Sequence, residues 1–179
     1  MPLLKPILEK LDRAQRNLLR AADAIPADLW KTCPRQGAWS AAELIAHIMT
    51  VERTVVVAAG RILRKQPKHT PLLKRFRLPF AFAEIRFVRL KTPIPVDLQL
   101  LRGKDAMLAE LREVRVRTLT LIEETRNRNL SAYRWRHPFL GSLNACEWFY
   151  LLGSHPIRHE KQMREIAANL PKLISGLQK

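Results

Sequence analysis

Residues 39–63 read WSAAELIAHIMTVERTVVVAAGRIL and carry the clearest helical signal in the chain. Ser40 is a favourable N-cap residue, and Glu43 three positions later completes a capping box. Beyond this start, apolar residues return every three or four positions, which is typical of a helix with one buried face. Three consecutive valines favour a strand locally, but the surrounding period outweighs them. The sequence therefore predicts a helix over about 40–65.

The same period occurs in three more segments of the chain. It predicts further helices at about 3–25, from about 97 to just before Asn127, and from about 144 to 170. The last of them begins like the helix over 40–65, because Asn144 and Glu147 have the spacing of a second capping box.

Two kinds of residue interrupt this pattern. Residues 31–38 and 128–142 have turn-forming composition and no apolar period, so we expect them to be loops. Pro156 lies inside the last predicted helix, where it removes a backbone donor and restricts His155 before it. We therefore expect a kink or a break near 153–156, which could turn His155 away from its neighbours.

The segment 66–96 determines the expected topology. It holds five of the chain's 12 prolines, so it excludes a long helix, although we expect a short one over 80–90. A tight antiparallel hairpin between helices needs only about 2–8 residues. We therefore predict a long crossover, with the second and third helices parallel. The expected fold is all-α, a single four-helix-bundle domain over 1–179.

Composition excludes several classes of protein. With 47% hydrophobic residues, the 179-residue chain can bury a core, which excludes wholesale disorder. No window approaches the roughly 18 uninterrupted apolar residues of a membrane span, and the first residues do not resemble a signal peptide. Cys33 and Cys146 are far apart, which argues against a disulfide framework. We expect a cytoplasmic protein.

Charge is the unusual property, since the formal net charge is +16. Residues 61–95 hold ten basic residues against one acidic residue, interleaved with four phenylalanines. Such a mixture can bind nucleic acid or an anionic surface, so a basic binding module with a vestigial metal site is the alternative function. A nucleic-acid partner is disfavoured because no nucleic-acid-binding motif accompanies the charge. The segment could instead border a site and favour anionic substrates.

Histidines form the strongest candidate site. His155 and His159 are four residues apart, so on a continuous helix they share a face and can chelate one ion. His47 lies on the apolar side of the second predicted helix. Three neutral imidazoles inside a bundle leave a coordination position open, as catalytic metal sites do. His69 and His137 fall in predicted loops, and we interpret both as non-ligands.

These residues also carry a resemblance to a known family. The helix start at Trp39, followed by His47 and Glu52, resembles the second helix of the DinB/YfiT-like superfamily. The stretch 138–144, followed by Glu147-Trp148, His155, Arg158-His159 and Gln162, resembles its fourth helix. The resemblance implies a four-helix bundle with a long crossover and a divalent ion (nickel, zinc, manganese or iron) on His47, His155 and His159. Its relatives include metal-dependent hydrolases and enzymes that transfer or use low-molecular-weight thiols.

An ion with an open position would acidify a bound water or thiol, which suits a hydrolase or a thiol-dependent transferase. Glu43 and Glu52 lie on either side of His47 and are candidate catalytic proton acceptors, although Glu43 also serves the capping box and Glu52 could be a solvated or paired group. Gln162, three residues after His159, is a candidate to orient an imidazole. The expected partner is a small-molecule substrate, anionic or a low-molecular-weight thiol, and a homodimer is possible.

Overall fold

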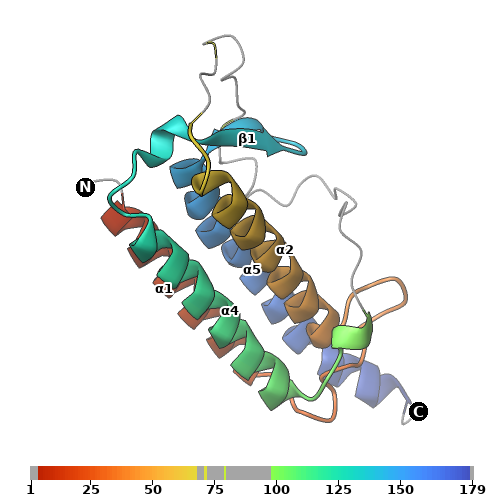
Figure 1. Ribbon diagram of the computed structural model, residues 1–179. Helices are drawn as coiled ribbons and strands as arrows, with labels where there is room; N and C mark the ends of the chain where they lie inside the picture. The colour runs from red at the N-terminus through yellow and green to blue at the C-terminus, as the bar shows by residue number, and fades with distance from the viewer. Residues whose placement is uncertain (1–3, 68–70, 72–78, 80–97, 178–179) are drawn as a thin grey trace.

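The computed structural model describes residues 4–67, 71, 79 and 98–177. Within this part of the chain, four long helices form a bundle (Figure 1). They are α1 (Leu4–Asp23), α2 (Ala41–Leu63), α4 (Lys104–Glu124) and α5 (Ala145–Leu177). The predicted all-α four-helix bundle is therefore confirmed. The short helix expected over 80–90 and most of the basic segment lie outside the described residues.

The direction of the helices confirms the predicted crossover. In Figure 1, α2 and α4 run in one direction while α1 and α5 run in the other. Contacts at both ends of the bundle agree with this arrangement. Lys104, at the start of α4, donates to the carbonyl oxygen of Ile25 just after α1, at 2.8 Å. Arg128, just after α4, donates to the carbonyl oxygen of Leu63 at the end of α2, at 2.6 Å.

Both predicted capping boxes are present and fix where α2 and α5 begin. The Glu43 backbone N–H donates to the Ser40 hydroxyl at 3.2 Å, and Glu43 Oε2 accepts from the Ser40 N–H at 2.7 Å. The second box is made by Asn144 and Glu147, with corresponding distances of 2.9 Å and 2.7 Å. Each box satisfies backbone donors that the first turn of a helix leaves without partners.

The core of the bundle is apolar, and α1 packs mainly on α5 while α2 packs mainly on α4. One cluster of buried side chains includes Trp30, which precedes α2 in the chain, and Met107, near the start of α4. The other includes Phe149, close to the start of α5. No helix in the described ranges combines the length and the hydropathy that a membrane crossing would require.

The prediction of a loop over 128–142 is wrong for most of these residues. A short 3₁₀ helix, η3 (Leu130–Ala132), leads into an antiparallel hairpin of β1 (Arg134–His137) and β2 (Gly141–Asn144). Gly141 has φ of +87°, a conformation that glycine adopts without steric cost. The third predicted helix also begins late, because α4 starts at Lys104 and only a 3₁₀ turn, η2 (Leu98–Leu100), precedes it.

The break expected at Pro156 is absent. α5 is helical without interruption from Ala145 to Leu177, and Pro156 is buried within it. A proline inside a helix removes one hydrogen bond and crowds the preceding turn. The extensive packing of α5 on α1 offsets that cost, since tertiary packing supplies most of a helix's stability.

Candidate metal centre

The structure brings together His47 of α2 and His155 and His159 of α5. One ring nitrogen of each lies within 4.8 Å of the others. The Nε2 atoms of His155 and His159 are 3.1 Å apart. The ring centroid of His47 is 5.2 Å from that of His155 and 5.1 Å from that of His159. Continuity of α5 through Pro156 keeps His155 and His159 on one face.

Burial keeps the imidazoles of His47 and His155 neutral at physiological pH. His47 is only 4% exposed, and burial lowers its pKa from 6.5 to about 4. Protein surrounds His155 on most sides, although part of its surface stays accessible. The pKa of His155 falls well below its usual value because of burial, and then because of the positive charges that His159, His47, Arg158 and His137 can carry. Neutral imidazole is the form that ligates metals.

The polar contacts of the cluster indicate where its protons and lone pairs lie. His159 Nδ1 lies 3.1 Å from Gln162 Oε1. An amide oxygen only accepts, so Nδ1 carries the proton and Nε2 presents its lone pair towards His155. His47 Nδ1 is buried and has no hydrogen-bond partner among the described residues. A buried nitrogen without a partner, beside two facing imidazole nitrogens, fits a cation as the missing partner.

Gln162 lies where the sequence predicted a group that orients an imidazole. Its amide oxygen lies 3.1 Å from His159 Nδ1, a position from which a polar group can orient an imidazole. Trp39, just before α2, packs its ring 5.0 Å from that of His47. Sequence spacing could not reveal this contact, because a residue just before an N-cap is expected to pack on the first turn of the helix, here on Leu44.

The two carboxylates predicted as proton acceptors have other partners in the structure. Glu43 Oε2 accepts from the N–H and the hydroxyl of Ser40, as the capping box requires. Glu52 is 2% exposed and pairs with the Arg115 guanidinium at 2.9 and 3.0 Å. The Thr118 hydroxyl also donates to Glu52, at 2.6 Å. Arg115 is itself buried, so this is an ion pair within the core that joins α2 to α4.

Of the two remaining histidines, His137 lies at the end of β1 and is not part of the cluster of three. Its Nδ1 accepts from the N–H groups of Phe139 and Leu140, both at 3.1 Å. His69 lies outside the described residues.

Comparison with known proteins identifies relatives of this chain. The family model of the DinB superfamily matches residues 10–163. A search of curated proteins returns no significant match. Among solved structures, the chain is similar to YfiT from Bacillus subtilis, described as a probable metal-dependent hydrolase with an unusual four-helix bundle topology. That similarity has a TM-score of 0.61 at 13% sequence identity and covers 93% of this chain and 87% of the other.

Proposed function

The chain belongs to the DinB superfamily, and from this premise we propose that it is a metal-dependent enzyme whose divalent ion is held by His47, His155 and His159. The observation that carries the proposal is the convergence of three imidazole nitrogens within 4.8 Å of one another. The description of YfiT as a probable metal-dependent hydrolase supports the same class of function. The metal is nickel, zinc, manganese or iron.

Three neutral nitrogen ligands leave a coordination position open, and an ion held in this way lowers the pKa of a bound water or thiol, which supplies a nucleophile at neutral pH. The protein's own part is to hold the three rings in place and to keep His47 and His155 neutral. Gln162 fixes the tautomer of His159 through its amide oxygen, and Trp39 packs against His47. The reaction is a hydrolysis or a transfer that uses a low-molecular-weight thiol.

Glu43 is the carboxylate that we retain as a candidate proton acceptor. It is half-buried and lies one helical turn before His47, and its Oε1 has no hydrogen-bond partner among the described residues. To Glu52 we assign a structural role, because Arg115 and Thr118 already satisfy its oxygens. Protonation of Glu52 would leave Arg115 without its counterion in the core.

The proposal is tested by metal content. Protein purified without chelator and without a polyhistidine tag is expected to contain about one divalent ion per chain by elemental analysis. The variants His47→Ala, His155→Ala and His159→Ala should each lose it. His69→Ala is the matched control, because it removes a histidine that we do not place in the site, and it should keep the ion. Full metal content in all three cluster variants would show that the ligand set is wrong.

Access to the open position is tested with cobalt. Cobalt-loaded protein should develop a new absorption band when a simple alkyl thiol is added, because the thiol enters the open coordination position. A spectrum that no thiol changes would contradict thiol use and leave hydrolysis as the reaction.

A further inference from the structure

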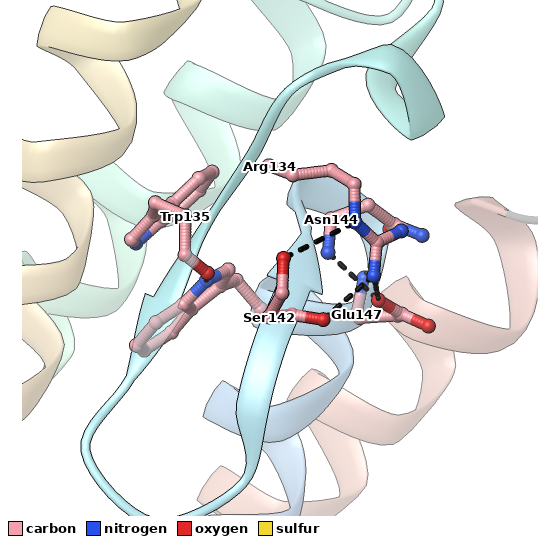
Figure 2. A network of polar contacts seen from close by, with 6 residues as sticks. Arg134, Trp135, Ser142, Asn144 and Glu147 are labelled. Atoms are coloured by element: carbon pink, nitrogen blue, oxygen red, sulfur yellow. Dashed lines mark hydrogen bonds and ion pairs between the residues drawn. The ribbon is translucent and has the colours of Figure 1, made fainter. Parts of the chain in front are cut away.

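The hairpin of β1 and β2 is fixed to the first turns of α5. The Arg134 guanidinium donates to the carbonyl oxygen of Ser142 at 2.6 Å and lies 3.4 Å from Glu147 Oε2 (Figure 2). Trp135 stacks on the ring of Trp148, with centroids 5.1 Å apart and planes 7° from parallel. These contacts determine where the end of β1 lies relative to α5.

His137 follows Trp135 by two residues, so both side chains leave the same face of β1. Its ring also packs on Trp148, at a centroid distance of 5.0 Å. Trp148 precedes His155 by seven residues and His159 by eleven, and at about 100° per residue the three lie in one row along α5. His137 therefore lies against the end of the row that carries two of the three clustered histidines.

The turn after β1 fixes the tautomer of His137. Two backbone N–H groups, those of Phe139 and Leu140, donate to Nδ1, so this nitrogen carries a lone pair. In a neutral ring the proton then belongs to Nε2, which becomes a fixed donor. Burial lowers the pKa of His137 to about 4, in agreement with a neutral ring. No described residue accepts from Nε2, and the side chain is partly exposed.

A fixed donor favours a ligand that accepts hydrogen bonds. The charged groups nearby determine which sign of charge on that ligand is favoured. His47 and His137 are neutral at physiological pH, so the permanent charge among the groups that act on His155 is that of Arg158, and no carboxylate is among those groups. An anionic oxygen is the acceptor that such surroundings favour.

From these contacts we propose that His137 is a substrate-binding residue, whose Nε2–H donates to a carboxylate-class oxygen of the substrate while the substrate's reacting end lies at the histidine cluster. This inference rests on the proposed function and adds to it the substrate class and the residue that recognises it. The β1–β2 hairpin is then one wall of the substrate site, held in place by Arg134 and Trp135.

The test compares thiols with and without a carboxylate on cobalt-loaded protein. The probes are mercaptoacetate, mercaptopropionate and mercaptobutyrate, each paired with the alkyl thiol of the same length, and dissociation constants come from the cobalt absorption band. At least one mercapto acid should bind about tenfold more tightly than its alkyl partner, the size expected of one hydrogen bond to a charged group. Both His137→Asn and His137→Phe should abolish that preference and leave alkyl thiol binding unchanged.

The two variants separate recognition from a role in the turn. Asn can still accept the N–H groups of the turn but lacks the distant donor, whereas Phe keeps the ring contact with Trp148 and lacks both. The inference would be overturned if His137→Asn still preferred a mercapto acid to its alkyl partner, or if the native protein and both variants showed the same preference. The carboxylate would then bind elsewhere. If the protein binds cobalt and alkyl thiols but binds no mercapto acid more tightly than its alkyl partner, only this inference fails. If the protein takes up no cobalt, the proposed function fails and this inference fails with it.

Discussion

The buried, neutral state of His47 predicts how the stability of the metal-free protein depends on pH. Burial lowers the pKa of His47 from 6.5 to about 4 in the folded chain, whereas the unfolded chain restores the ordinary value. Below pH 6.5 the unfolded chain therefore binds a proton that the folded chain does not, and the free energy of unfolding falls as the pH falls. The loss continues until the pH reaches the folded pKa of about 4.

The size of the effect follows from the two pKa values. A pH of about 5 is about 1.5 units below the pKa of His47 in the unfolded chain. At about 1.36 kcal/mol per unit, His47 alone then removes about 2 kcal/mol of stability relative to about pH 7.5. Its side chain is 4% exposed, so solvent screening does not reduce this value much.

Urea unfolding with a chelator present measures this effect. The free energy of unfolding is compared at about pH 7.5 and about pH 5 for the native sequence and for His47→Gln, whose side chain does not titrate. Groups that are not coupled to His47, such as the exposed carboxylates, titrate in both proteins and cancel in the comparison. The native sequence should lose about 2 kcal/mol more than the variant. An equal loss in the two proteins would refute the buried, neutral state of His47.

Three further predictions concern single contacts. Arg115→Met should reduce the free energy of unfolding in urea by about 3–5 kcal/mol, because it leaves Glu52 charged and buried without its partner; a loss below about 1 kcal/mol would contradict a buried ion pair. Gln162→Leu should weaken metal binding about 10–100-fold in a chelator competition assay, because His159 loses the acceptor that orients it; unchanged affinity would remove this role. Ser40→Ala should lower the thermal midpoint through a loss of about 1 kcal/mol at the capping box, and an unchanged midpoint would contradict the cap.

Local sequence signals predicted most of the fold. The two capping boxes act over four residues each, so Ser40 with Glu43 and Asn144 with Glu147 could be identified without any tertiary information. The parallel arrangement of α2 and α4 followed from the length and proline content of 66–96. Helical spacing placed His155 and His159 on one face, and the structure adds that His47 lies within reach of both.

Features that depend on distant contacts could not be predicted in this way. Glu52 and Arg115 are 63 positions apart in the chain, and nothing near Glu52 indicates its partner. The hairpin consists of two four-residue strands, too short for a clear alternation, and Gly141, the first residue after its turn, has a positive φ. The break predicted at Pro156 is absent because local propensity does not include the packing that keeps α5 continuous.

Coordination of one ion by three imidazoles is the central claim, and X-ray absorption at the zinc edge tests it most directly. The measurement uses zinc-loaded protein that carries no affinity tag. We expect three imidazole nitrogens at about 2.0–2.1 Å from the zinc and one further light ligand at the open position. Fewer than three imidazoles around the zinc, or the same spectrum from His47→Ala, would contradict the claim.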